Sequence, residues 1–153
     1  LQPPFSLIDR KAARELIPWA HQHATGVIVY SPMESGILTD SFGPERVAAM
    51  DAGDWRRAAG AFNEPELGRN LSLRDALRPI ARRHDASVSA IAIAWALAWH
   101  GVTAAIVGAR SPKQVDGWIG APDVSLTEAD LADIASAVEQ TGAGKGPAVP
   151  RRA

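Results

Sequence analysis

The stretch GVIVYSPMESGILTDSF, residues 26–42, decides the fold of this chain. It opens with Gly26–Tyr30, whose aliphatic and aromatic side chains predict a buried β-strand. The chain then changes abruptly to a polar loop, Ser31-Pro32-Met33-Glu34-Ser35-Gly36. In α/β proteins a ligand commonly binds where a strand ends in such a loop. We therefore expect a ligand site at the carboxyl end of this strand.

Helices and strands alternate around this stretch. The spacing of apolar residues predicts a helix from Arg10 to His23, capped by Asp9, before the strand. A later helix, apolar nearly all round, is expected over Val88–His100 with Ser87 as its cap, and another buried strand over Val102–Val107. Helix followed by strand across a short connection is the pattern of a parallel α/β fold.

Further segments complete the expected architecture. Leu1–Leu7 is expected to form a short strand that ends, or becomes an edge, at Pro3 and Pro4, because proline cannot donate to a β-ladder. Residues 37–68 are irregular, and a loop of that length is usually functional or mobile. The glycine-rich and proline-rich segment 141–153 is expected to be disordered. Additional helices are expected over 46–50, over 71–84 with Asn70 as cap, over 112–118, and from Thr127 onward, where Thr127-Glu128-Ala129-Asp130 resembles a capping box.

Composition is typical of one globular domain. The chain has 153 residues, of which 46% are apolar and 22% charged, with a net charge of −1. The scattered arginines and the small net charge argue against nucleic acid as a partner. The chain has no cysteine, which excludes disulfides and thiolate sites and fits a cytoplasmic protein. No apolar run reaches the roughly 18 residues of a membrane span, and no signal peptide opens the chain, so no membrane association is expected.

Two strand ends carry residues suited to a nucleotide. The ring of Tyr30 offers a stacking surface, and Arg110 offers a guanidinium fork for a phosphate. The alternatives are that Tyr30 packs against its neighbours, that Gly108 is an ordinary turn residue and that Arg110 is an ordinary surface cation. Neither strand end matches a dinucleotide or phosphate-loop fingerprint. The first strand end comprises Tyr30, Ser31, Ser35 and Gly36, and the second comprises Gly108, Ala109, Arg110 and Gln114.

The sequence offers no catalytic or metal-binding constellation. Ser35 lacks the glycine pattern of a nucleophile elbow. The histidines fall near expected helix carboxyl ends, which favour cations, and no pair has metal-ligand spacing with carboxylate support. We therefore assign no catalytic residue and no metal ligand. The five tryptophans are expected to be packing residues for the most part, and Trp55 in the long loop is the one expected to line a pocket.

Five stretches, taken together and in order, resemble one known family. They are LQPPFSL (1–7), GVIVYSPMESGILTDSF (26–42), the segment from Arg69-Asn70-Leu71 through SVSAIAIAWAL (69–97), GVTAAIVGARSPKQVDGWIGA (101–121) and SLTEADLADIASAVEQTGAG (125–144). The chain resembles the carboxyl-terminal half of an aldo-keto reductase. That family folds as a (β/α)8 TIM barrel and binds NADPH across the carboxyl ends of its strands. The resemblance implies an incomplete barrel over residues 1–140, with Leu1–Phe5, Gly26–Tyr30 and Thr103–Val107 as its sixth, seventh and eighth strands.

The resemblance also implies a role for each candidate site residue. Gln2 takes the place of the glutamine that bonds the nicotinamide carboxamide, and Tyr30 matches the aromatic residue that stacks on the nicotinamide. Arg110 is placed to meet the 2′-phosphate, which favours NADP (NADPH) over NAD. The loop along the pyrophosphate is matched by Ser31, Pro32, Met33, Ser35, Gly36 and Leu38, and the adenosine end by Gly108, Ala109, Arg110 and Gln114.

This chain departs from the family in two places. Many members carry Glu-Asn where Gly117-Trp118 stands here, so Trp118 is expected to stack on the adenine instead. A lysine often found in the family is replaced by Ser41, which removes one pyrophosphate contact.

The implied activity is reduction of an aldehyde or ketone by NADPH, with this chain supplying the cofactor-binding part. In the family the catalytic tyrosine, aspartate, lysine and histidine come from the first strands of the barrel, and those motifs are absent here. The single tyrosine, Tyr30, is assigned to stacking. The expected partner is the amino-terminal half of the barrel, and the start at Leu1 within an expected strand suggests a truncated chain. The alternative is a non-catalytic remnant or regulatory module that binds a nucleotide or a partner chain.

Overall fold

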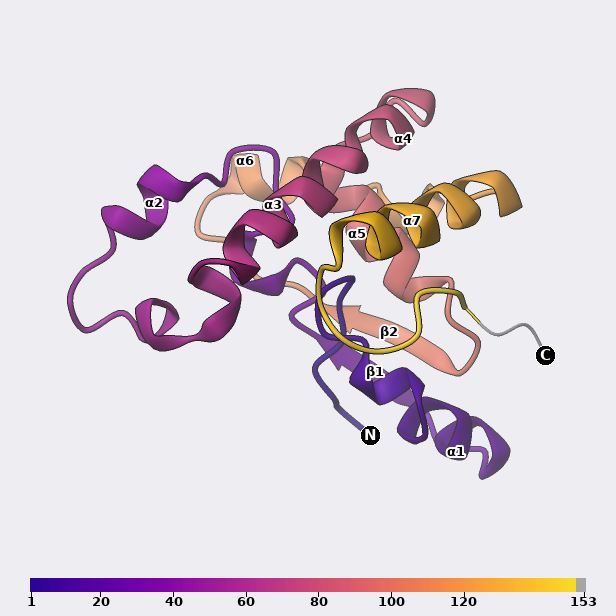
Figure 1. Ribbon diagram of the computed structural model, residues 1–153. Coiled ribbons are helices and arrows are strands. Elements are labelled where there is room, and N and C mark those ends of the chain that lie inside the picture. Colours follow the sequence, from indigo (N-terminus) through magenta and orange to yellow (C-terminus); the bar gives the residue numbers. More distant parts are fainter. Residues whose placement is uncertain (151–153) are drawn as a thin grey trace.

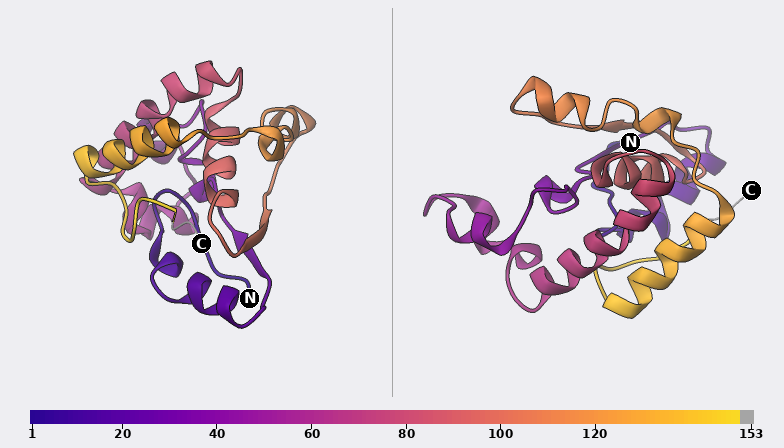
Figure 2. Two further views of the ribbon diagram at one scale, coloured as in Figure 1. Left: turned by 90° about the vertical axis from the view of Figure 1, so that its right-hand side faces the viewer. Right: turned by 90° about the horizontal axis from the view of Figure 1, so that it is seen from above.

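A small parallel β-sheet organises the chain. In the computed structural model, which describes residues 1–150, β1 (Val27–Tyr30) and β2 (Val102–Ile106) pair in parallel with Tyr30 opposite Ile106. Figure 1 shows the two strands side by side, below α3, α5 and α7 and above α1, and the left view of Figure 2 shows that most helices lie on one side of the sheet. Because the strands are parallel, their carboxyl ends meet at one edge.

The segment Leu1–Phe5 runs beside β1 as an interrupted third strand. The Tyr30 N–H donates to the Pro3 carbonyl and the Phe5 N–H donates to the Tyr30 carbonyl, both at 3.0 Å. Pro4 and Tyr30 form an isolated parallel bridge rather than a continuous ladder. Two successive residues without an N–H explain the interruption, as the sequence predicts.

The first helix is shorter than predicted because of a proline. Instead of one helix over 10–23, a 3₁₀ turn at Lys11–Ala13 precedes α1 (Leu16–Gln22). A helix that began near residue 10 would place Pro18 in its interior, where the ring has no N–H for the Arg14 carbonyl and clashes with it. In a helix that begins at Leu16, the same proline lies in the first turn, where an N–H has no helical partner in any case.

A proline also divides the helix predicted over 71–84. The structure has α3 (Glu66–Ala76) followed by α4 (Arg78–Arg83), with Pro79 in the first turn of α4. The prediction of one continuous helix is therefore wrong at this point. A proline in the middle of that helix would have cost about 3 kcal/mol, whereas at the start of a new helix it is tolerated.

The long segment 37–68 contains short helices that the sequence only partly indicates. They are α2 (Pro44–Ala48) and 3₁₀ turns at Trp55–Ala58 and Gly60–Phe62. Asn70, predicted as a helix cap, lies instead inside α3, where it is buried and donates to the Ala61 carbonyl at 3.1 Å. Its carboxamide thereby holds the end of the long segment against α3.

The helix α5 (Val88–Leu97) runs through the core, as its all-round apolar sequence predicts. Its cap is confirmed, because the Ser87 hydroxyl accepts a hydrogen bond from the Ala90 N–H at 3.0 Å. Trp95 is fully buried in α5 and stacks on Phe5, with ring centroids 5.4 Å apart. This contact joins α5 to the segment beside β1. The short helix α6 (Pro112–Asp116) follows β2, close to the predicted 112–118.

The segment after α7 (Glu128–Thr141) lies along the amino-terminal loop. The sequence predicts disorder over 141–153, yet the Lys145 N–H donates to the Ile8 carbonyl at 3.0 Å. The buried Arg10 guanidinium donates to two carbonyls of this segment, at 3.1 and 3.2 Å. These contacts tie residues 143–146 to the amino-terminal loop. Residues 151–153, the end of the segment predicted to be disordered, lie outside the described part of the chain.

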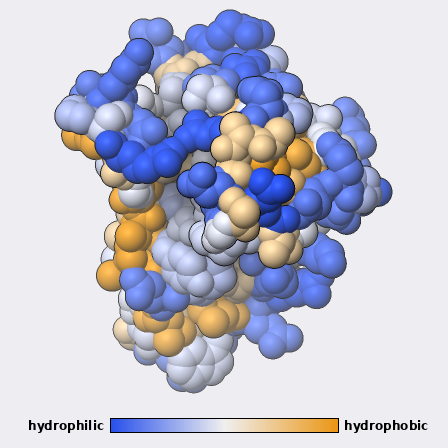
Figure 3. Space-filling model, turned by 90° about the vertical axis from the view of Figure 1, so that its left-hand side faces the viewer, coloured by the Kyte–Doolittle hydropathy of each residue, from blue (hydrophilic) through white to orange (hydrophobic). Residues whose placement is uncertain are grey.

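One face of the sheet exposes apolar side chains. Val27 and Val29 of β1 are buried under the helices, whereas Ile28 is 44% exposed and Tyr30 is 41% exposed. Ile106, opposite Tyr30 in β2, is 43% exposed. Side chains alternate between the two faces of a strand, so within residues 1–150 this face lacks a covering layer. Figure 3 shows a band of apolar surface along one side of the molecule. Such a patch is typical of a contact surface.

Asp130 connects α4 to the start of α7. Its carboxylate is 2% exposed and bonds Arg83 Nη2 at 2.6 Å and His84 Nε2 at 2.8 Å. It also completes the predicted capping box by accepting a hydrogen bond from the Thr127 N–H at 2.9 Å. Burial alone would raise the pKa of Asp130, but the hydrogen bonds from Arg83, Thr127 and His84 outweigh burial and hold the pKa well below its usual range.

We predict that Asp130→Ala lowers the free energy of unfolding by about 2 kcal/mol, because it removes the N3 carboxylate of the α7 capping box and leaves Arg83 and His84 without their buried partner. A depressed pKa stabilises the fold above the unfolded-state pKa of about 4, and this stabilisation is lost as the pH falls through the folded-state pKa. The difference between parent and variant should therefore shrink below about pH 4. Urea unfolding of both proteins at several pH values measures this difference in the free energy of unfolding.

The matched control is Asp133→Ala, since Asp133 also contacts Arg83 but its side chain is 58% exposed. Its effect should stay within about 0.5 kcal/mol. Equal stability of the parent and the Asp130 variant at neutral pH would contradict the prediction.

Candidate functional site

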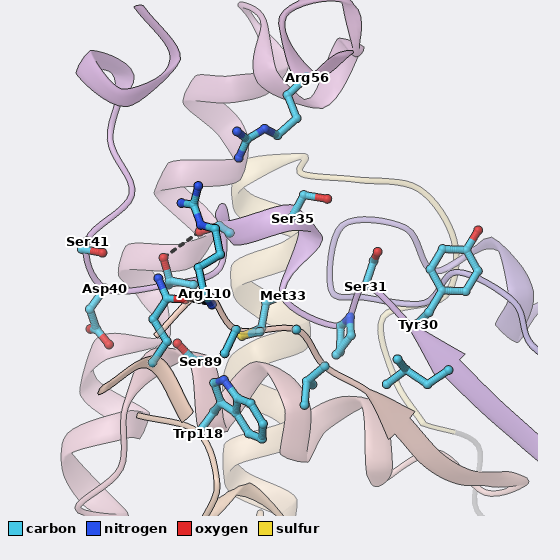
Figure 4. A pocket seen from close by; sticks show the side chains of 18 of the residues that line it. Tyr30, Ser31, Met33, Ser35, Asp40, Ser41, Arg56, Ser89, Arg110 and Trp118 are labelled. Carbon is cyan, nitrogen blue, oxygen red and sulfur yellow. Dashed lines mark hydrogen bonds between the residues drawn. The ribbon is translucent and has the colours of Figure 1, made fainter. Parts of the chain in front are cut away.

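The carboxyl ends of β1 and β2 open into one pocket of about 760 Å³. The loop after Tyr30 forms one wall, and the segment from Val107 to Arg110 forms the facing wall. Figure 4 shows Tyr30 at one end of the pocket, with Arg110 and Trp118 toward the other end. Residues of the long segment, including Trp55 as predicted, complete the lining.

The structure brings together the two strand ends that the sequence singles out. Of the thirteen predicted site residues, the eleven that line the pocket are Tyr30, Ser31, Pro32, Met33, Ser35, Gly36, Gly108, Ala109, Arg110, Gln114 and Trp118. Gln2 and Leu38 are not among the lining residues. Leu38 is fully buried in the hydrophobic core, where it supports the loop from behind, and Gln2 is exposed on the edge segment.

The loop after β1 has an unusual backbone. Ser31, Glu34 and Ser35 have φ angles of 56°, 46° and 50°, and Gly36 has a φ of 108°. Residues other than glycine rarely adopt positive φ, and each such residue costs about 1 kcal/mol or more. Surrounding contacts must therefore hold this loop in place.

Glu34 supplies one of these contacts. Its Oε2 accepts a hydrogen bond from the Ser6 hydroxyl at 2.6 Å, and the same hydroxyl accepts hydrogen bonds from the N–H groups of Ile8 and Asp9. Burial raises the pKa of Glu34, and the hydrogen bond from Ser6 partly offsets that rise. The loop that follows the Leu1–Phe5 segment thus fixes the loop that follows β1.

Two arginines of the helical layer hold the next part of the pocket wall. The buried Arg74 donates to the Thr39 carbonyl at 3.3 Å and also to the Phe42 carbonyl. Arg78 bonds Asp40 at 3.0 Å, and the other carboxylate oxygen of Asp40 accepts a hydrogen bond from the Val88 N–H at 3.2 Å. The amino end of α5 is therefore fixed against the pocket.

Several lining residues were not predicted as site residues. They come from the irregular segment and from α5: Thr39, Asp40, Ser41, Arg46, Arg56 and Ser89, together with Ile106 and Val107 of the second strand end. For Ser89 the signal was present, because the Ser87 cap places the next residues of α5 beside the strand ends. Ser41 stands where the family often has a lysine, and Ile106 and Val107 directly precede Gly108 in the predicted strand. For Thr39, Asp40, Arg46 and Arg56 the sequence carries no comparable signal, since their positions depend on long-range contacts.

The cations of the pocket differ in how they are paired. Arg56 forms an ion pair with Asp54, with Nε and Oδ1 2.9 Å apart. The hydrogen bonds from the Arg56 side chain and backbone lower the pKa of Asp54 to about 2. The Arg110 N–H donates to Gln114 Oε1 at 2.7 Å, while the Arg110 guanidinium forms no hydrogen bond or ion pair with any residue from 1 to 150. Arg46 lies over the Phe42 ring at 5.8 Å.

Within the described residues 1–150, no three histidine, aspartate or glutamate side chains are grouped so that they could hold a metal ion. In the same part of the chain, no helix is both long enough and apolar enough to cross a membrane.

Comparison with known proteins agrees with the geometry. Among curated proteins, an NADH-specific methylglyoxal reductase of Escherichia coli is 27% identical over 143 residues, which are 92% of this chain and 43% of that protein. An uncharacterized oxidoreductase of Mycobacterium tuberculosis is 33% identical over 147 residues, which are 94% of this chain and 44% of that protein. This chain therefore spans less than half the length of the relatives that it matches.

Among solved structures, the glycerol dehydrogenase AKR11B4 from Gluconobacter oxydans superposes with a TM-score of 0.82 at 27% identity, over 99% of this chain and 43% of that one. The α/β fold is thus similar to the aldo-keto reductase TIM barrel, and two parallel strands are consistent with an incomplete barrel. The sequence profile of the Aldo/keto reductase family matches residues 1–139, and the chain belongs to that family.

Proposed function

We propose that this chain supplies the cofactor-binding part of an NADPH-dependent aldo-keto reductase that reduces an aldehyde or a ketone. The observation that carries the proposal is the pocket at the joined ends of β1 and β2, in a chain that belongs to this family. We assign Leu1–Phe5, β1 and β2 to the sixth, seventh and eighth strands of the barrel. We also place the protein in the cytoplasm, since a chain without cysteine suits a reducing compartment.

The volume of the pocket supports binding of a dinucleotide. Its volume of about 760 Å³ falls in the range of ordinary small-molecule sites. When bound, the cofactor would supply the hydride, and this chain would bind and orient it. In our assignment Tyr30 stacks on the nicotinamide, and Gln2, on the edge segment outside the lining, bonds the nicotinamide carboxamide. The pyrophosphate follows Ser31, Pro32, Met33, Ser35 and Gly36, with Leu38 buried behind this loop.

The charge of the pocket fits a phosphorylated ligand. Asp40 in the lining is already paired with Arg78, and Asp54, next to the lining residue Trp55, is paired with Arg56. The guanidinium groups of Arg46 and Arg110 have no carboxylate partner within residues 1–150. Positive charges in excess attract an anion, and a guanidinium suits the oxygens of a phosphate. This supports a role for Arg110 at the 2′-phosphate of NADP.

The proton donor comes from outside this chain in our proposal. We assign the single tyrosine, Tyr30, to stacking on the nicotinamide, and we assign no residue of this chain to catalysis. The amino-terminal half of the barrel would supply the general acid that protonates the carbonyl oxygen. It would also cover the exposed side chains of Ile28, Tyr30 and Ile106.

A second function follows from the same observation. A chain with a nucleotide pocket and a single, non-catalytic tyrosine also fits a regulatory module that binds a nucleotide or a partner chain. The coding sequence upstream of Leu1 distinguishes the reductase from the regulatory module. A first half with the catalytic residues supports the reductase, and a start codon at Leu1 supports the module.

The direct test is a titration of this chain with NADPH, followed by tryptophan fluorescence, because Trp55 and Trp118 line the pocket. We expect saturable quenching. In the complete protein we expect oxidation of NADPH that depends on an added aldehyde or ketone. Absence of both signals would refute the proposed function.

Arg110→Ala should weaken NADPH at least about tenfold and leave NADH nearly unchanged, because a charged hydrogen bond to a phosphate contributes about 1.5 to 3 kcal/mol. Competitive binding of the two cofactors measures the ratio. Lys113→Ala is the control, since it removes an exposed cation of α6 that does not line the pocket. If the substitution weakened the binding of NADPH and NADH equally, the assignment of Arg110 to the 2′-phosphate would be wrong. The same experiment shows which cofactor the parent chain prefers. We expect NADPH, whereas similarity to the relative named as NADH-specific would suggest NADH.

Asp54→Asn should strengthen NADPH binding at low ionic strength, because it releases Arg56 from its ion pair and adds one positive charge at the pocket. The gain should fade as salt rises, since exposed charges are screened. Asp51→Asn, a substitution at an exposed site in the same loop, controls for the change in net charge. Unchanged or weaker binding by the Asp54 variant at low salt would contradict this account of the charge.

A further inference from the structure

Two histidines that are far apart in the sequence face each other near the amino ends of the strands. Nε2 of His21 and Nε2 of His100 lie 2.6 Å apart, although the two residues are 79 positions apart in the chain. Their rings meet edge to face, with centroids 3.8 Å apart. Both residues are exposed, so a solute can reach the pair from solvent. His21 precedes β1 and His100 precedes β2, so the pair is remote from the pocket at the carboxyl ends of the strands.

The backbone beneath both rings is fixed by the core. His21 belongs to the last turn of α1, which the buried side chain of Ile17 anchors one turn earlier. His100 follows Trp99, whose indole is buried against other aromatic rings. Gly101 has a φ of 94°, and a Cβ at this position would lie 3.1 Å from the Cβ of His21, so a glycine here allows the turn to approach α1. The fold therefore brings the two imidazoles together before any ligand binds.

The contact between the two nitrogens suits a ligand that accepts two lone pairs. In a hydrogen bond between two Nε2 atoms, one ring must donate an N–H and the other must accept it. The separation of 2.6 Å is shorter than the roughly 2.9 Å that is typical of a hydrogen bond from an N–H group. When the donor ring carries its proton on Nδ1 instead, two Nε2 lone pairs become available side by side. Neutral imidazole nitrogens of this kind are the commonest metal ligands in proteins.

The spacing favours a metal that takes its ligands at right angles. With metal–nitrogen bonds of about 2.1 Å, two nitrogens at a right angle lie about 3.0 Å apart, and two at a tetrahedral angle lie about 3.4 Å apart. The right angle, typical of Ni²⁺ and Cu²⁺, requires the smaller movement of the rings from the observed separation. Within residues 1–150 no third histidine, aspartate or glutamate extends the pair into a larger metal-binding group, so water would occupy the other positions.

The helix ends beside the pair also favour a cation. His21 lies in the last turn of α1, and His100 follows the carboxyl end of α5. The last carbonyl groups of a helix have no partner within the helix and carry a partial negative charge. A bound cation would therefore gain from both helices in addition to its bonds to the two nitrogens.

We propose that His21 and His100 form a two-histidine site for a divalent transition-metal cation of the Ni²⁺ or Cu²⁺ type, which joins α1 to the turn between α5 and β2. The site does not rest on the proposed function, because neither histidine lines the pocket. In the unfolded chain the two ligands are distant, so the cation binds the folded chain preferentially and stabilises it. The spacing of histidines in the sequence carries no sign of this site, since its ligands come from separate elements.

The test is a calorimetric titration of the chain, without a histidine tag, with nickel chloride, together with thermal unfolding at saturating Ni²⁺. We expect one Ni²⁺ per chain and a higher unfolding temperature with Ni²⁺ than without it. His21→Ala and His100→Ala should each weaken Ni²⁺ binding at least about tenfold, because even the loss of a residue that only orients a metal ligand costs ten- to hundredfold. The double variant should bind Ni²⁺ about as weakly as either single variant, since one imidazole alone cannot chelate.

His23→Ala is the matched control, because His23 is also an exposed histidine at the end of α1, but its ring stacks on Trp19 with centroids 4.1 Å apart. This variant should bind Ni²⁺ as the parent does. Thermal unfolding without metal verifies that every variant is folded. The two-histidine site would be overturned if the parent bound no Ni²⁺, if both site variants kept the parent's affinity, or if the His23 variant lost as much affinity as they do. None of these results changes the expectation for NADPH, which a separate titration tests.

Discussion

The parallel pairing of β1 with β2 is the constraint on which the site depends. Tyr30 and Ile106 stand opposite each other at the last position of the ladder, so two loops that are about 75 residues apart in sequence begin at the same edge. The β1 loop contributes a polar, strained backbone, and the β2 loop contributes Arg110 and the start of α6. A shift of the register would separate these two walls and remove the pocket.

The pocket wall is held from outside by polar contacts rather than by its own secondary structure. Ser6 fixes Glu34, Arg74 fixes the backbone near Phe42, and Asp40 joins Arg78 to the first turn of α5. Such supporting contacts offset the cost of a backbone with several positive φ angles. Arg46 and Arg110 form no ion pair within residues 1–150, so the pocket keeps positive charge for a ligand.

Features that depend on neighbouring residues were predictable from the sequence, and features that depend on distant contacts were not. The Ser87 cap, the Thr127 capping box and the strands follow from local patterns, and the structure has them. The spacing of apolar residues extends two helices across Pro18 and Pro79, but in the structure each proline lies in the first turn of a shorter helix. Asn70 has the residue type of a helix cap, but its partner is a carbonyl in another element, and the segment after α7 is held by the distant Arg10. The same limit explains the site: its strand ends were predicted, whereas Thr39, Arg46 and Arg56 reach the pocket through tertiary packing.

Tyr30 belongs both to the exposed face of the sheet and to the lining of the pocket. A second protein segment that covered this face would therefore also touch the wall of the ligand site. Binding of the segment and binding of the ligand are then thermodynamically linked, and each must change the affinity of the other by the same factor. On this view a nucleotide would act as an assembly factor, because filling the pocket would shift the equilibrium between the uncovered and the covered sheet.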